Sequence, residues 1–449
     1  MGLPYFAVTH NFVTAPCVPF TYKAMLRATS SKMMPLANHV PIPKNGVDYR
    51  GKVVLAPMVR AGTLPTRILS LRYGADLVWG PETVDRSMIG TTRRVNPVTK
   101  TIEFTRPPSH STKDAQGEVR ESVIFRIHPE LESRKLIFQI GTASPETAVQ
   151  ASKVVARDVA GIDVNAGCPK PFSTTGGMGA ALLEVPDLLC SILRSLVKEV
   201  GAVYEIGISV KIRLLKSLER TEALVRALCQ TGIVGLTIHC RTPDMRPRQR
   251  VLREHLSALA EICREAGVAC LMNGDVDSRE QALALIKEYR LDGAMIARGA
   301  ESNPSCFRLT KDGGLVAWLP LAQEYLRIAM EVDNNFSNSK WMLAKLIPGK
   351  SPLYIGAQKS KDYKTLCSVL ETPALLELAQ AVDIRIGLSP MAQSATSEDK
   401  SGNIVGSISA AGRKRKRVET EEETAELNSD LIDGRQLLKA SAATATATE

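Results

Sequence analysis

Eight short apolar runs, rich in β-branched residues, recur between residues 53 and 299, and this recurrence limits the fold more than any other feature. The runs are VVLAP at 53–57, DLVWG at 76–80, LIFQIG at 136–141, GIDVNAG at 161–167, ISVKIR at 208–213, GLTIHC at 235–240, ACLMNG at 269–274 and GAMIARG at 293–299. Helix-compatible segments follow them at 62–73, 144–158, 184–200, 219–231, 251–267 and 278–290. Eight strands in strand-then-helix order predict an α/β fold, a TIM (β/α)8 barrel.

The chain outside this pattern divides into further parts. A polar stretch at 91–134 separates the second expected strand from the third, and we interpret it as an inserted loop or small hairpin. After residue 305 the pattern becomes helical over 316–332, 338–347 and 360–387, which predicts a bundle of three or four helices. The predicted domains are an extension over 1–48, the barrel over 49–305, the helical domain over 306–392 and a disordered tail over 393–449.

Both ends of the chain carry unusual composition. Residues 1–45 contain no Asp or Glu, which resembles a mitochondrial transit peptide, although prolines and few arginines favour a disordered extension equally. The tail holds a basic run at 413–417, followed by acidic residues. Such a run is typical of a nuclear signal or a nucleic-acid contact, and a solvated charge run is the alternative. Cytoplasm, nucleus and mitochondrion therefore all remain open as compartments.

Charge and cysteine content narrow the class of protein. A net charge of +10 favours polyanionic partners such as nucleic acid, although a basic tail alone would also explain it. The nine cysteines include no CxxC pair, which argues against a structural metal site or disulfides and favours a reducing compartment. No run of eighteen apolar residues is present, so we expect no membrane span. We expect a monomer.

Polar or unusual residues stand at the C-terminal ends of seven of the eight expected strands. They are Met58, Gln139, Asn165, Lys211, His239, Asn273 and Arg298. Any one has a structural explanation, since a lone His after an apolar run is more often a hydrogen-bonded core residue. Lys211 is harder to explain so, because a buried ammonium without an anionic partner is costly. Since TIM barrels bind ligands at this face, we interpret the seven as one site.

The last two expected strands indicate a phosphorylated ligand. Asn-Gly-Asp at 273–275 and Ala-Arg-Gly at 297–299 place glycines and a cation in the loops where this fold binds phosphate. Asp275 is expected to cap the next helix or to hold a hydroxyl. Lys211 and Gln139 lie deeper, where they can donate hydrogen bonds to the polar edge of a flavin ring.

Residues 164–183, VNAGCPKPFSTTGGMGAALL, form the segment richest in chemical signals. Cys168 precedes a proline and therefore adopts an extended or turn conformation. A thiol there, beside Lys170 and over a flavin, can donate a proton. The alternative is a Gly-rich loop in which the cysteine is incidental, and composition alone does not separate the two.

These strings together resemble the tRNA-dihydrouridine synthases over about residues 50–390. The resemblance rests on LAPMVRAGTLPTR, IFQIG, GIDVNAGCPKPFSTTGGMGAALL, SVKIR, TIHCRT, NGD and IARG, in that order. GTLP after the first strand and DNNFSNSK at 333–340 resemble the eukaryotic branch that acts on uridine 20. Cys240 departs from the pattern, since a glycine commonly follows the histidine. The tail is also too short and too polar for the double-stranded-RNA-binding domain of animal members.

The resemblance implies that FMN lies at the barrel mouth, that NADPH or NADH reduces it, and that tRNA is the substrate. Hydride then goes to C6 of the uracil while Cys168 protonates C5. The implied flavin contacts are Pro57, Met58, Val59, Gln139, Lys211, His239, Asn273, Gly274, Asp275, Ala297, Arg298 and Gly299. The implied substrate contacts are Asn165 and Lys170 near the base, and Lys340 with Lys345 on the tRNA backbone. His239 is a second acid or only a flavin ligand. Two alternative functions stay open: another FMN barrel that acts on a small pyrimidine, or a tRNA-binding chaperone.

Overall fold

The computed structural model describes residues 39–107 and 121–389, in which eight parallel strands close into a barrel. The strands are β1 (Lys52–Leu55), β2 (Val78–Trp79), β7 (Leu136–Gly141), β8 (Gly161–Ala166), β9 (Gly207–Arg213), β10 (Gly235–His239), β11 (Ala269–Asn273) and β12 (Gly293–Ile296). Strands β7 to β12 pair in chain order, β12 pairs with β1, and the β1–β2 and β2–β7 pairings close the ring. The predicted TIM barrel is confirmed, with every strand where the sequence placed it.

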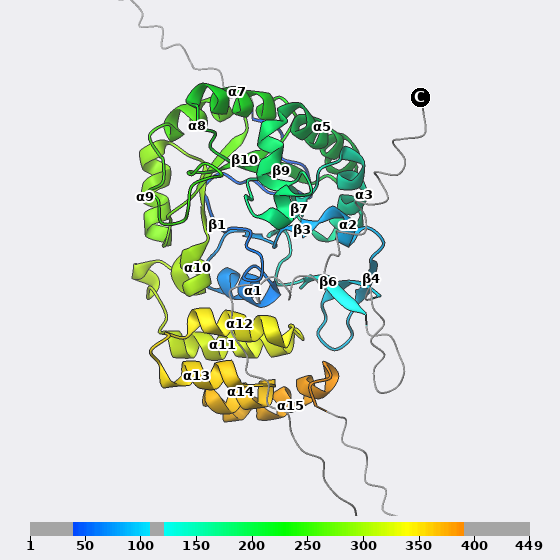
Figure 1. Ribbon diagram of the computed structural model, residues 1–449, viewed down its shortest axis with the longest axis vertical. Helices are drawn as coiled ribbons and strands as arrows, with labels where there is room; N and C mark the ends of the chain where they lie inside the picture. Colours follow the sequence, from blue (N-terminus) through cyan, green and yellow to red (C-terminus); the bar gives the residue numbers. More distant parts are fainter. Residues whose placement is uncertain (1–38, 108–120, 390–449) are drawn as a thin grey trace, which may run out of the picture. The chain divides into compact units, whose positions relative to one another are not determined.

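Helices surround the strands (Figure 1). They are α1 (Leu64–Arg72), α3 (Pro145–Val155), α5 (Pro186–Leu196), α7 (Leu218–Cys229), α8 (Leu256–Glu265) and α9 (Arg279–Tyr289). Ser144, Ser217 and Ser278 cap α3, α7 and α9, each accepting a hydrogen bond from a backbone N–H three residues on. The expectation that Asp275 caps the helix after the seventh strand is therefore wrong, because Ser278 occupies that position.

Tyr49 closes the N-terminal end of the barrel. Its side chain is buried and its ring contacts Trp79, with 5.3 Å between centroids. Gly235 begins β10 beside this ring, and a Cβ there would lie 2.3 Å from the Tyr49 Cδ2 atom. Only glycine leaves room for the tyrosine, which therefore fills this end. In TIM barrels ligands bind at the opposite face, at the C-terminal ends of the strands.

The insertion after β2 is a small antiparallel sheet. After β3 (Thr83–Val84) and α2 (Asp85–Met88) come β4 (Thr92–Val95), β5 (Ile102–Arg106) and β6 (Ser122–Ile127), paired in the order β4-β5-β6. Phe104 and Phe125 are opposite each other in this sheet, and both are buried in the main core. The insertion was expected to be a loop or small hairpin, whereas the structure has a three-stranded sheet that packs on the main core.

Residues 316–389 of the C-terminal region contain five α-helices. They are α11 (Trp318–Glu331), α12 (Phe336–Leu346), α13 (Pro352–Lys359), α14 (Tyr363–Val369) and α15 (Leu376–Arg385). The sequence pattern missed α13 and merged α14 with α15, which are separated by a turn through Pro373. Leu64 and Ile68 of α1 pack in the same buried cluster as Tyr325 of α11. The division at residue 305 stays a prediction.

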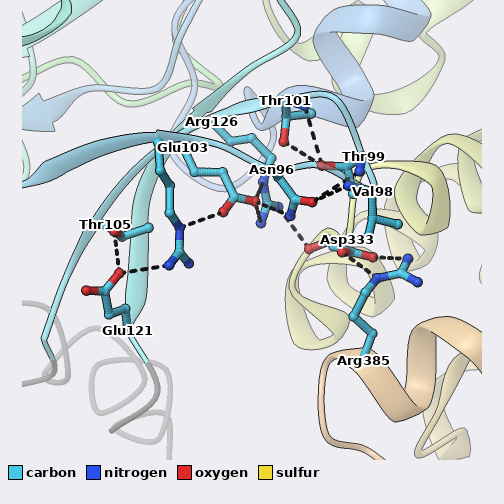
Figure 2. Close-up of polar contacts among 11 residues, drawn as sticks. Asn96, Val98, Thr99, Thr101, Glu103, Thr105, Glu121, Arg126, Asp333 and Arg385 are labelled. Atoms are coloured by element: carbon cyan, nitrogen blue, oxygen red, sulfur yellow. Dashed lines mark hydrogen bonds and ion pairs between the residues drawn. The ribbon is translucent and has the colours of Figure 1, made fainter.

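Polar contacts join the inserted sheet to this helical region (Figure 2). Glu103 of β5 is buried and accepts hydrogen bonds from Asn96 at 3.1 Å and from Arg126 Nε at 3.0 Å. The same Arg126 donates to the Asp333 backbone carbonyl at 2.8 Å, and Arg385 pairs with the Asp333 carboxylate at 2.5 Å. One arginine therefore links the sheet to the loop between α11 and α12.

Several expectations fall outside the described residues. They concern the targeting-like extension up to residue 38, most of the insertion at 105–120, and the basic run at 413–417. Within residues 39–107 and 121–389, no helix is long and apolar enough to span a membrane.

Candidate active site

The register of the barrel strands aligns polar side chains in rows. Gln139, Asp163 and Ser209 are neighbours in one row across β7, β8 and β9. Two residues further along, Asn165 of β8 is paired with Lys211 of β9. Because parallel strands share an edge, the residues that end them are brought together at the C-terminal face of the barrel.

The lowest row surrounds a buried carboxylate. Asp163 accepts hydrogen bonds from Gln139 Nε2 at 2.8 Å and from Ser209 Oγ at 2.7 Å. Burial raises the pKa of Asp163 to about 6, although these hydrogen bonds and the nearby Lys211 ammonium oppose the shift. Part of the donor capacity of Gln139 is thus used within the protein.

Lys211 and His239 lie in a strongly cationic environment. Burial lowers the pKa of Lys211 to about 8, and Arg213 adds to this effect. Burial, followed by Lys211 and Arg213, lowers the pKa of His239 to about 2. His239 is therefore a neutral imidazole at pH 7, which disfavours the alternative of a second acid. Its Nδ1 atom is buried without a hydrogen-bond partner in the described part of the chain.

The loop after β8 holds Cys168 at the mouth of the barrel. Asn165 Oδ1 accepts hydrogen bonds from the backbone N–H groups of Gly167 at 3.0 Å and Cys168 at 3.1 Å. Arg213 Nε donates to the Gly167 carbonyl at 2.8 Å, and the Ala180 N–H donates to the Cys168 carbonyl at 2.9 Å. These contacts fix the backbone on both sides of the half-buried thiol. Asn165 thus orients the cysteine loop, and its contact with a uracil stays a prediction.

Glu82, three residues after β2, is a site residue that the sequence analysis missed. Ser173 Oγ, from α4 (Pro171–Thr174), donates to Glu82 Oε1 at 3.1 Å. Burial raises the pKa of Glu82, and the neighbouring side chains of Asn165, Ser173 and Cys168 oppose this shift. The second strand was the one without a polar residue at its end, and Glu82 of the PETV segment supplies it.

The predicted phosphate end contains a carboxylate between two arginines. Asp275 pairs with Arg241 at 2.6 Å and also with Arg298. A cavity of about 160 Å³ opens beside them. Its lining includes Arg213, His239, Asn273, Gly274, Asp275, Ala297 and Arg298. The Asn273 amide donates to the Met295 carbonyl at 3.1 Å, which fixes one wall. Gly299 follows in α10 (Arg298–Ser302), where a Cβ would lie 2.6 Å from the Asp277 carbonyl oxygen.

The remaining predicted residues vary in exposure. Pro57 and Met58 after β1 are half-buried, whereas Val59 and Lys170 are exposed. Lys340 Nζ donates to the Ser360 carbonyl at 3.1 Å and lies over the Phe336 ring. Lys345 pairs with Glu301 at 3.3 Å and lies over the Trp341 ring. Both lysines are thus engaged within the protein, and their contact with tRNA stays a prediction.

The described residues contain no group of three or more His, Cys, Asp or Glu side chains placed to hold a metal ion. What they do contain is a thiol, a neutral imidazole and several cations around one opening. A (β/α)8 barrel with such a site at the C-terminal ends of its strands belongs to the class of TIM-barrel proteins that bind ligands at this face.

Comparison with known proteins identifies the family. The sequence matches the dihydrouridine synthase (Dus) family over residues 54–332, and the chain belongs to that family. A Schizosaccharomyces pombe tRNA-dihydrouridine(20) synthase [NAD(P)+] is 48% identical, over 72% of this chain and 66% of its own length. The Saccharomyces cerevisiae tRNA-dihydrouridine(20) synthase [NAD(P)+] is 43% identical, over 72% of this chain and 84% of its own. The S. pombe tRNA-dihydrouridine(20a/20b) synthase [NAD(P)+] is 30% identical, over 57% of this chain and 68% of its own.

Proposed function

We propose that this protein reduces uridine to 5,6-dihydrouridine at position 20 of the tRNA D-loop, with FMN as its flavin and NADPH or NADH as reductant. Family membership and the two relatives named for uridine 20 support the reaction and the position. The observation that carries the mechanism is the position of Cys168, fixed at the mouth of a barrel lined by cations. The monomeric state remains a prediction of the sequence.

The described residues fit a phosphorylated flavin. Lys211 forms no ion pair in the described part of the chain, so its charge is available for the ring. The unpartnered Nδ1 of His239 can contact a polar ring atom. Arg298 and the backbone of 273–275 and 297–299 would hold the phosphate beside the 160 Å³ cavity. FMN, when bound, supplies the hydride for C6 of the uracil and is itself reduced by the nicotinamide.

The chain supplies the proton. As hydride reaches C6, the S–H bond of Cys168 breaks and a C–H bond forms at C5, which leaves a thiolate. Burial raises the pKa of the Cys168 thiol, so this group carries its proton at neutral pH. A uracil in folded tRNA is stacked, so the base must leave the stack to reach this thiol.

The test uses the purified protein with an unmodified tRNA that carries uridine 20, and with the same tRNA carrying cytidine there. Dihydrouridine is measured by mass spectrometry of tRNA fragments. We expect it only in the first tRNA, and we expect Cys168→Ala to lower its rate by about 10²- to 10⁴-fold. Cys190→Ala, which removes a thiol of α5, is the matched control. Equal activity on free uridine would contradict a tRNA substrate, and full activity of Cys168→Ala would contradict the acid.

A further inference from the structure

The Glu82 carboxylate lies half-buried between the loops that follow β2, β7 and β8. Gly141 of β7 makes room for it, since a Cβ there would lie 2.5 Å from Glu82 Oε1. Within residues 39–107 and 121–389, no Lys, Arg or His forms an ion pair with this carboxylate. Its hydrogen bond comes instead from the neutral Ser173 hydroxyl, at 3.1 Å. The same hydroxyl lies beside Cys168, since a Cβ on Gly179 would be 2.4 Å from Ser173 Oγ and 3.2 Å from the Cys168 Cβ. Removing a charge from water without a cationic partner is costly, so we expect the Glu82 carboxylate to have a function at this position.

Glu82 opposes the other charges that face Cys168. The backbone of Lys170, followed by Arg213 and Lys211 of β9, favours the thiolate. Burial, and after it Glu82, act in the opposite direction and keep the pKa of the Cys168 thiol above its ordinary value. Without the carboxylate, burial alone would oppose the cations at the barrel mouth.

We propose that Glu82 is a positioning residue that keeps Cys168 in the thiol form and directs its S–H bond between turnovers. This proposal rests on the function of Cys168 as the acid of the uridine reduction. A thiolate has no proton to give, and it is also the form that alkylating agents and oxidants attack. The carboxylate offers an acceptor for the S–H group and disfavours a second negative charge beside it.

The experiment measures the alkylation of Cys168 by iodoacetamide between pH 6 and pH 10, in full-length purified protein. Mass spectrometry of the Cys168 peptide separates this thiol from the others. Glu82→Gln keeps the size and an acceptor oxygen but removes the charge. We expect its alkylation midpoint to fall by about one pH unit, so that the rate at pH 7 rises about tenfold. Glu82→Asp, which retracts the carboxylate by one methylene, should fall between the two.

Two controls separate charge from structure. Glu184→Gln makes the same change at an exposed glutamate that pairs with Arg220, and it should leave the midpoint unchanged. Ser173→Ala removes the hydrogen bond that anchors Glu82 but keeps the negative charge, so it should not lower the midpoint. An unchanged midpoint in Glu82→Gln, or an equal fall in Ser173→Ala, would overturn the proposal.

The alkylation readout does not depend on turnover. If Cys168→Ala kept full dihydrouridine formation, the proposed role of Cys168 would fail while the shift in Glu82→Gln would still be seen. If instead Cys168 proved essential but Glu82→Gln left both its alkylation midpoint and kcat unchanged, only the role of Glu82 would fail.

Discussion

Replacing Glu132 with Gln would remove the charge partner of a buried guanidinium beside the barrel mouth. Arg67 of α1 pairs with Glu132 through its Nε atom at 2.6 Å and its Nη2 atom at 3.2 Å. The two side chains are 1% and 0% exposed, so water cannot replace the lost partner. Arg67 also donates to the Gly62 carbonyl at 2.9 Å and to the Arg126 carbonyl at 2.7 Å. It therefore joins the loop after β1 to the inserted sheet.

The size of the effect follows from this burial. Removing one partner of a buried ion pair costs about 3–5 kcal/mol, because the other charge is left uncompensated. Gln keeps one acceptor oxygen for Arg67, so we expect about 3 kcal/mol of lost stability for Glu132→Gln. Glu199→Gln is the matched control, since Glu199 pairs with Lys153 at 3.2 Å with both side chains about half exposed. Exposed pairs of this kind contribute about 0–1 kcal/mol.

The assay is urea unfolding at pH 7, followed by circular dichroism, for the wild type and both variants. We also expect Glu132→Gln to lower the affinity for FMN, because Arg67, which donates to the Gly62 carbonyl in the loop after β1, is then held less firmly. A loss below about 1 kcal/mol, equal to that of Glu199→Gln, would refute the reasoning that burial makes this pair matter.

Two further predictions concern the flavin site. When FMN is added to flavin-free protein, its affinity should fall as the pH rises through about 8, because Lys211 loses its positive charge there. Lys211→Arg should reduce this fall, which fluorescence titration at several pH values measures. An equal fall of affinity with pH in both proteins would exclude Lys211 as its source. Arg298→Ala should weaken FMN binding by about 10- to 100-fold, as expected for one charge-assisted hydrogen bond. Arg250→Ala, which removes an 87% exposed cation, should leave the affinity nearly unchanged, and equal losses in the two variants would remove Arg298 from the phosphate site.

The barrel and most of the site could be predicted because each depends on local pattern. A buried strand is recognised by its own residues, and parallel strands necessarily bring their C-terminal ends to one edge. The strand pattern therefore predicted that Gln139, Lys211 and His239 lie at the same end of the barrel. Glu82 was missed because β2 is only two residues long and Gly80 and Pro81 separate it from the glutamate. The sequence alone does not identify a glutamate beyond Gly-Pro as a strand-end residue.

The strands of the inserted sheet have recognisable sequence patterns, although the surrounding residues are mostly polar. IEFT at 102–105 alternates apolar and polar residues, which is the period of a strand, and SVIFRI is rich in the β-branched and aromatic residues that strands favour. Prolines and charges around them favoured a loop in the sequence analysis. Phe104 and Phe125 are nevertheless buried against the barrel, and Phe125 contacts Phe138 of β7 with 4.9 Å between ring centroids.

Charge pairs between distant segments could not be predicted, for a different reason. Arg67 and Glu132 are 65 residues apart, and Arg126 lies 207 residues from Asp333, whose carbonyl it contacts. With 57 basic and 47 acidic side chains in the chain, many such pairings are compatible with the sequence. Only closure of the barrel selects among them, because it decides which loops meet. The same holds for Glu82 and Cys168, which lie on either side of the Ser173 hydroxyl only because the β2–β7 pairing closes the ring. The sequence could therefore place the thiol at the barrel mouth, but not the carboxylate that we propose controls its proton.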